Sequence, residues 1–210
     1  MSDRRHQAVL LFGAPGVGKG TQGKALGCIP GFFHFSMGDA FRSLDASSSL
    51  GVQVRSFTSQ GDLVPDELTV QLWRETIDRL VEDGEYRPGR DLLVLDGIPR
   101  SVRQVELLKP LVDVLRVLHL TCTDEDTKNQ LVERLRKRAI RESRADDARD
   151  DVIRHRFDIY RDETQPVLAQ FDSGVVVEFN PLGTPAEVLQ RVLSVVAPIQ
   201  RDLAHAAVSA

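Results

Sequence analysis

Residues 13–21 read Gly-Ala-Pro-Gly-Val-Gly-Lys-Gly-Thr and match the pattern GxxxxGK[ST], with one extra glycine before the threonine. In such a loop the glycines let backbone N–H groups turn inward around a phosphate, and the following helix N-terminus adds partial positive charge. Lys19 supplies a point charge for the outer phosphates, and the Thr21 hydroxyl is suited to assist Mg²⁺ directly or through water. The predicted triphosphate-binding residues are Gly13, Ala14, Pro15, Gly16, Val17, Gly18, Lys19, Gly20 and Thr21.

Several arginines could neutralise the charge of further phosphates, and many of the chain's basic residues lie between positions 134 and 161. A guanidinium group binds phosphate oxygens in pairs and stays ionised, which suits phosphoryl transfer because that reaction depends on positioning and charge stabilisation. On charge alone, however, the interleaved Asp and Glu residues favour a solvated, salt-bridged helix. Asp96, at the end of an apolar run, is a candidate for orienting Mg²⁺ through water.

Short apolar runs without alternation are typical of buried parallel strands. Helical spacing of apolar residues fills the intervals, and Thr184 begins a Thr-Pro-Ala-Glu segment that resembles a capping box. This alternation predicts an α/β chain with a five-stranded parallel sheet, helices on both faces and ligands at the carboxyl edge. Together with the glycine-rich loop after the first strand, it predicts a three-layer P-loop NTPase fold. The predicted strands are residues 8–12, 32–35, 92–95, 117–122 and 175–179, and the predicted helices are residues 67–81, 124–138, 152–168 and a last one after residue 184.

The composition is ordinary for a globular chain, with 210 residues, 41% hydrophobic and 28% charged. A net charge of -4 gives no general attraction to nucleic acid or to an anionic membrane, and no run approaches the ~18 apolar residues that span a bilayer. Cys28 and Cys122 form no CxxC pair, so they are predicted to be buried packing residues in a reducing cytoplasm. Residues 198–210 have no assigned role, and their end is predicted to be disordered.

Four segments resemble the adenylate kinase family, and they occur in the family's order: residues 13–22, 36–42, 61–67 and 96–104. The resemblance covers nearly the whole chain. It implies an ATP:AMP phosphotransferase that uses Mg²⁺ with ATP, has ATP, AMP and ADP as its small-molecule partners, and is a monomer.

The resemblance also implies roles for single residues. Arg42 and Arg100 would hold the acceptor phosphate, and Gln104 would read the adenine edge of AMP. Arg134 would stack against the ATP base, and backbone near Gly183 would meet the same base. The implied AMP-binding residues are Ser36, Met37, Arg42, Val64, Gly97, Arg100 and Gln104, the implied catalytic residues are Lys19, Arg100, Arg138, Arg144 and Arg156, and the implied indirect Mg²⁺ contacts are Asp96 and Thr21.

Residues 133–138 resemble the entry to the family's mobile lid, and residues 144–147 and 152–156 resemble its exit. The short spacing between Arg138 and Arg144, without Cys or His, predicts a short lid that holds no zinc. Closure of such a lid excludes water, which otherwise competes as acceptor. The predicted division is a core of residues 1–35, 66–136 and 148–210, a monophosphate-binding insertion of residues 36–65, and a lid of residues 137–147.

The identity of the acceptor base stays open at this point. Met37 stands where adenylate kinases usually carry threonine, and relatives that act on UMP or CMP also differ there. Gln104 favours AMP, because a retained hydrogen-bonding group discriminates more than an altered apolar wall. The alternatives are a UMP, CMP or other monophosphate kinase, a P-loop ATPase with water as acceptor, and a non-catalytic nucleotide sensor. The retained Lys19 and arginines argue against the last two.

Overall fold

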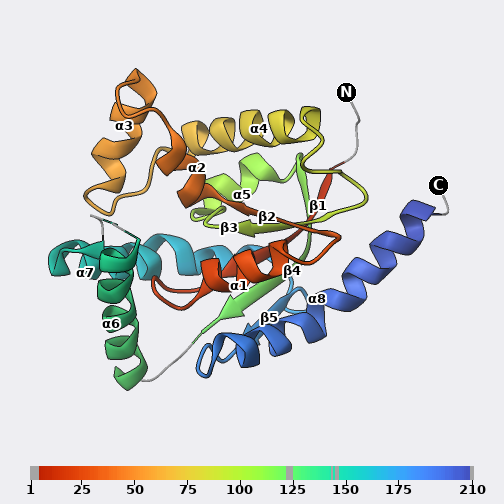
Figure 1. Cartoon of the computed structure of the whole chain (residues 1–210). Coiled ribbons are helices and arrows are strands. Elements are labelled where there is room, and N and C mark those ends of the chain that lie inside the picture. Colours follow the sequence, from red (N-terminus) through yellow and green to blue (C-terminus); the bar gives the residue numbers. More distant parts are fainter. Residues whose placement is uncertain (1–4, 122–124, 143, 145–146, 209–210) are drawn as a thin grey trace.

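A computed structural model describes residues 5–121, 125–142, 144 and 147–208. The described strands form one sheet in the order β2-β3-β1-β4-β5, and all neighbouring strands run parallel (Figure 1). The carboxyl ends of the strands therefore meet at one edge. This confirms the predicted five-stranded parallel sheet. The strands are β1 (His6–Phe12), β2 (Phe32–Ser36), β3 (Leu92–Asp96), β4 (Val112–Leu120) and β5 (Val176–Phe179).

The helices fill the intervals between strands. They are α1 (Lys19–Gly27), α2 (Met37–Ser43), α3 (Ser49–Thr58), α4 (Asp66–Glu82), α5 (Val102–Leu108), α6 (Glu125–Arg141), α7 (Asp150–Ile159) and α8 (Pro185–Val208). Figure 1 shows α4 and α5 on one side of the sheet and α1 and α8 on the other. It also shows α3, α6 and α7 gathered beyond the same end of the sheet.

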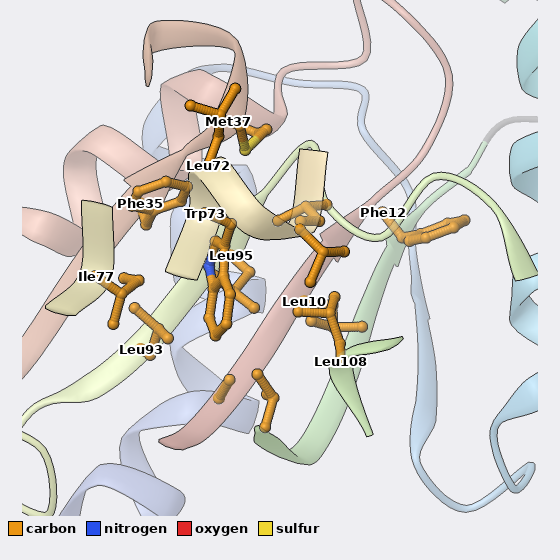
Figure 2. Close-up of a cluster of buried hydrophobic side chains, with 14 of the residues drawn as sticks. Leu10, Phe12, Phe35, Met37, Leu72, Trp73, Ile77, Leu93, Leu95 and Leu108 are labelled. Atoms are coloured by element: carbon orange, nitrogen blue, oxygen red, sulfur yellow. The ribbon is translucent and has the colours of Figure 1, made fainter. Parts of the chain in front are cut away.

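Each face of the sheet has its own apolar cluster, because side chains alternate along a strand. Ala8 and Leu10 of β1 pack with Trp73 of α4, and Val9 and Leu11 pack with helices of the opposite face. Figure 2 shows the first cluster, in which Trp73 is 1% exposed and Met37 belongs to the same packed group. These two clusters fix the sheet that carries the site.

Two predicted elements differ from the observed ones. The helix predicted at residues 152–168 is interrupted, because α7 ends at Ile159 and is followed by a π-helical turn, η2 (Tyr160–Thr164), and a 3₁₀ segment, η3 (Gln165–Gln170). Pro166 near the start of η3 has no N–H to continue an α-helix. Strand β4 begins at Val112, earlier than predicted. The sequence pattern missed its first half because that half is only partly buried and its apolar run is broken by Asp113 and Arg116.

Predictions for the cysteines and the tail also need correction. Cys28 is exposed, because it lies at the C-cap of α1, where the chain turns at the surface. Cys122 and the predicted helix start at Asp124 lie outside the described residues. Residues 198–208 of the tail are helical, because α8 continues through Pro198 to Val208 and buries Leu203 at 5% exposure. Residues 209 and 210 lie outside the described residues. Within the described part of the chain, no helix is long and apolar enough to span a membrane.

Candidate active site

The glycine-rich loop joins β1 to α1 at the carboxyl edge of the sheet. Gly13 has φ 140° and Gly18 has φ 108°, a region that L side chains rarely adopt. A Cβ atom at Gly13 would lie 2.3 Å from the Leu120 carbonyl oxygen, so glycine is required there. Gly18 is the left-handed N-cap of α1. The loop therefore turns tightly and leads directly into a helix N-terminus, which suits an anion.

The side chain of Lys19 folds back onto this loop. Its Nζ donates to the Gly13 carbonyl oxygen at 2.6 Å and to the Ala14 carbonyl oxygen at 3.0 Å. Burial lowers the pKa of Lys19 to about 7; Asp96 opposes this shift, and neighbouring arginines, Arg100 first, add to it. A phosphate bound beside Lys19 would favour the charged ammonium, because an opposite charge stabilises it.

One buried carboxylate joins two of the predicted lid arginines. Arg138 donates from Nε to Asp147 Oδ2 at 2.6 Å and from Nη2 to Oδ1 at 3.0 Å, and Arg156 donates from Nη1 to Oδ1 at 2.5 Å. The Asp147 side chain is 0% exposed, whereas those of Arg138 and Arg156 are 25% and 15% exposed. Asp147 therefore holds guanidinium groups from α6 and α7 together beside the cavity.

The remaining arginines approach the same space from other elements. Arg100 Nε donates to the Gly97 carbonyl oxygen at 3.0 Å. Burial lowers the pKa of Arg144, and the positive charges of Arg138 and Arg42 lower it further. Such mutual repulsion indicates that like charges converge here. A bound anion would relieve that repulsion.

The side opposite the loop is built from α2, α4 and α5. Ser36 caps α2 by accepting from the Asp39 N–H at 3.2 Å, and Met37 directly after it is 1% exposed. Arg42 pairs with Asp39. Burial acts to raise the pKa of Asp39, but the hydrogen bond and charge of Arg42 outweigh it, so the pKa lies below its usual value.

Gln104 is held by two hydrogen bonds at the start of α5. Its Oε1 accepts from the Arg100 backbone N–H at 2.7 Å, and its Nε2 donates to Asp66 Oδ1 at 2.8 Å. Gln104 is 2% exposed and lines the cavity together with Met37 and Val64. The part of this side around Gln104 is therefore organised by directed hydrogen bonds.

The residues predicted to contact Mg²⁺ fit that ion. Asp96 ends β3; burial acts to raise its pKa, but His34 and Lys19 outweigh it and keep the carboxylate ionised. Thr21 lines the same cavity as Asp96. The described residues hold no group of three His, Cys, Asp or Glu able to bind a metal by themselves. One carboxylate and one hydroxyl beside a phosphate site suit Mg²⁺, which keeps several waters and takes phosphate oxygens.

A single cavity of about 960 Å³ collects nearly all predicted site residues. Gly13 and Ala14, the first two residues of the loop, are absent from its lining; Gly13 instead lines an adjoining cavity of about 60 Å³. The predicted residues that line the large cavity are Pro15, Gly16, Val17, Gly18, Lys19, Gly20, Thr21, Ser36, Met37, Arg42, Val64, Asp96, Gly97, Arg100, Gln104, Arg134, Arg138, Arg144, Arg156 and Gly183.

Sequence reasoning missed the residues that position these groups. Asp147 was only part of a lid-like segment, and its neighbours Ala145 and Asp146 lie outside the described residues. Asp66 and Ser101 had no predicted role, although Ser101 caps α5 by accepting from the Gln104 N–H. The Ser-x-x-Gln spacing of residues 101–104 is a capping-box pattern that could have found the second of these.

A strand–glycine loop–helix unit that opens onto a cation-lined cavity defines a nucleotide-binding P-loop protein. Comparison with known proteins places the chain more narrowly. The Adenylate kinase family model matches residues 11–175. The chain is 36% identical to an adenylate kinase of Thermus thermophilus over 190 residues, which cover 89% of this chain and 95% of that relative.

Two further relatives agree. The adenylate kinase of Kocuria rhizophila is 36% identical over 192 residues, covering 89% of this chain and 96% of the relative. The adenylate kinase of Micrococcus luteus is 37% identical over 196 residues, covering 90% of this chain and 89% of the relative. The chain belongs to the adenylate kinase family, which confirms the resemblance and the predicted phosphotransferase class.

Proposed function

We propose that the chain transfers the terminal phosphoryl group of ATP to AMP and produces two molecules of ADP. One observation carries this proposal: a single cavity has the phosphate loop on one side, the segment from Ser36 to Arg42 with Gln104 on the other, and Lys19 and Arg100 in its lining. Water as an acceptor needs no second phosphate-binding side. The two-sided cavity therefore favours a monophosphate kinase over an ATPase.

On the donor side, the loop and Lys19 hold the ATP phosphates, and Arg138, Arg144 and Arg156 neutralise charge that develops on the transferred group. Arg134 and backbone at Gly183 receive the ATP base, a role that their position in the same cavity supports. Because Asp147 already aligns Arg138 with Arg156, little reorganisation is needed when the phosphate arrives.

On the acceptor side, Arg42 and Arg100 hold the AMP phosphate, and Met37, Val64, Gly97 and Gln104 surround the base. Ser36 keeps α2 in place through its cap, so that Met37 and Arg42 face the cavity together. The function of these residues is to bring the acceptor oxygen in line with the transferred phosphorus, which supplies much of the rate enhancement in such reactions.

Mg²⁺ would enter with ATP and be held through waters by Asp96 and Thr21. When bound, Mg²⁺ neutralises phosphate charge. The chain's own contribution is to keep Asp96 ionised and close to the loop. A Cβ atom at Gly20 would lie 3.4 Å from Asp96 Oδ2, so the loop passes close to the carboxylate.

The proposed division is a core of residues 1–35, 66–136 and 148–210, an AMP-binding insertion of residues 36–65 and a metal-free lid of residues 137–147. The position of α3 opposite α6 and α7 around one end of the sheet supports it (Figure 1). A monomer is proposed from the family resemblance, and a cytoplasmic location from the two cysteines, which form no CxxC pair. Light scattering after size-exclusion chromatography tests the monomer.

A coupled assay of ADP formation from ATP and Mg²⁺ tests the reaction, with AMP, UMP and CMP as acceptors in turn. We expect AMP to be the preferred acceptor and to give two ADP per ATP consumed. Lys19→Met should lose most of the activity, whereas Lys109→Met, at the exposed end of α5, should keep it. ADP release without any acceptor would identify an ATPase and contradict the proposal, as would a preference for UMP or CMP.

A further inference from the structure

Asp66 lies at the centre of a hydrogen-bond network beneath the acceptor side of the cavity. Its Oδ1 accepts from Ser101 Oγ at 2.8 Å and from Gln104 Nε2 at 2.8 Å. Ser101 Oγ accepts in turn from the Gln104 N–H at 3.1 Å, so the Ser101 hydroxyl proton is directed to Asp66. Asp66 does not itself line the cavity. Of the two side chains that it contacts, Gln104 lines the cavity.

The network determines which way the Gln104 amide faces. A glutamine side chain is ambivalent, because turning it by half a rotation exchanges its carbonyl oxygen and its NH₂ group. At Gln104 both ends meet partners that cannot be exchanged: the Asp66 carboxylate only accepts, and the Arg100 backbone N–H only donates. The turned amide would place oxygen against carboxylate and N–H against N–H. The observed orientation is therefore the satisfied one.

The satisfied orientation leaves a defined pattern for a ligand. The NH₂ group has one hydrogen left and Oε1 has one lone pair left, since each uses one of two within the network. A 6-aminopurine presents an acceptor at N1 beside a donor at its amino group, and so complements that pattern. A 6-oxopurine presents the reverse, a donor at N1 beside an acceptor at O6.

We propose that Asp66 is a positioning residue that sets acceptor specificity: by holding the Gln104 amide in one orientation, it admits 6-aminopurine monophosphates and rejects 6-oxopurine monophosphates. The inference rests on the proposed AMP-binding role of Gln104 and extends it. Without Asp66, only the Arg100 backbone N–H would oppose a turned amide. Gln104 would then discriminate less strongly between the two classes of purine.

Asp66→Asn tests this role with little change in shape. The asparagine oxygen can still accept from Gln104 and Ser101, so AMP should remain a substrate. The asparagine NH₂ can also donate to a turned Gln104, which removes one of the two obstacles to a 6-oxopurine. We expect the ratio of kcat/KM for AMP over inosine monophosphate to fall roughly tenfold or more, because an unmatched buried hydrogen-bonding group carries about that penalty.

Glu67→Gln is the matched control. Glu67 neighbours Asp66 in the first turn of α4 and loses the same charge, but its contact is an exposed ion pair with Arg103. Its acceptor ratio should equal that of the wild type. Asp66→Ser repeats the test with a hydroxyl that can donate or accept, and thermal unfolding of each variant confirms that it is folded.

Equilibrium binding of AMP and inosine monophosphate, measured by calorimetry without ATP, separates this inference from the proposed reaction. If the wild type forms no ADP but binds AMP preferentially and Asp66→Asn narrows that preference, the reaction is wrong and the role of Asp66 stands. The role of Asp66 would be overturned if Asp66→Asn left the ratio of AMP to inosine monophosphate unchanged, even with equal losses for both acceptors. It would also be overturned if Glu67→Gln changed that ratio by the same factor. Wild-type protein that binds both monophosphates equally would also overturn it.

Discussion

The site contains two chemically different regions, one for the phosphates and one for the acceptor base. The phosphate region is a cluster of charged groups where the loop meets α6 and α7. It consists of Lys19, Arg100, Arg138, Arg156 and Asp147. The base region combines an apolar wall with one network of directed hydrogen bonds. The wall is formed by Met37 and Val64, and the network by Ser101, Gln104 and Asp66.

The difference concerns what each region can tolerate. In the phosphate region, burial and the neighbouring arginines lower the pKa of Lys19 to about 7, so a bound anion would favour its charged form. In the base region nearly every polar atom already has a partner within the chain. Loss of one charge should therefore reduce the rate, whereas loss of one directed hydrogen bond should reduce selectivity.

The largest effect is expected from Arg100→Ala in the phosphate region. Removing a guanidinium that stabilises developing charge should lower kcat/KM by about 10³-fold or more. Arg103→Ala should stay within about twofold, because Arg103 forms only exposed ion pairs with Glu67 and Glu106. Steady-state kinetics on both variants measure this contrast. A fully active Arg100→Ala protein would remove Arg100 from the reaction.

Asp147→Asn should have the next largest effect, because it leaves Arg138 and Arg156 without their shared carboxylate. We expect the free energy of unfolding to fall by about 3 kcal/mol, at the low end for breaking a buried pair, since both arginines keep some solvent access. Asp150→Asn breaks a pair with Arg136 that is about half exposed and should cost about 1 kcal/mol or less. Urea unfolding compares them; equal losses would contradict the distinction.

Met37→Thr addresses the apolar wall of the base region. Shortening a side chain that is 1% exposed should lower the free energy of unfolding by about 2 kcal/mol. The preference for AMP over UMP should change less than about threefold, because Gln104 supplies the hydrogen bonds that discriminate. The acceptor panel measures this preference. A tenfold change would assign the preference to the wall instead.

The smallest effect concerns His119, a neutral side chain behind the phosphate region. Its Nε2 lies 3.1 Å from the Tyr160 hydroxyl and its Nδ1 lies 3.3 Å from Glu178 Oε1. Burial lowers the pKa of His119 below the ordinary 6.5, although Glu178 opposes the shift. The unfolded chain therefore takes up its proton first as the pH falls.

Because the pKa of His119 is lower in the folded chain than in the unfolded chain, its contribution to stability is complete above about pH 6.5 and is progressively lost below it. His119→Gln should flatten the acid side of the stability curve by at most about 1.4 kcal/mol per pH unit. Urea unfolding at several pH values between about 5 and 7.5 measures how the free energy of unfolding changes with pH. His6, whose pKa is lowered by burial in the same direction, remains in both proteins, and the exposed His205→Gln serves as control. Parallel curves for wild type and His119→Gln would refute the assignment.

Local patterns carried most of what could be predicted. The spacing of Gly13 to Thr21 and the apolar runs of the strands depend on neighbours in sequence. The structure has this loop between β1 and α1 and confirms the five parallel strands. Asp66 and Gln104 are separated by 38 positions and meet only because α4 packs against α5. The same holds for Asp147, whose two partners lie on different helices. Nothing short-range marks such pairs, and the break of α7 before Pro166 was hidden by an unbroken apolar spacing.

The carboxylate of Asp147 has one more consequence. It lies between the guanidinium groups of Arg138 and Arg156 and neutralises part of their charge. The net positive charge that a nucleotide meets there is therefore smaller than the number of guanidinium groups. Affinity for ATP should accordingly weaken with added salt less steeply than the number of arginines suggests.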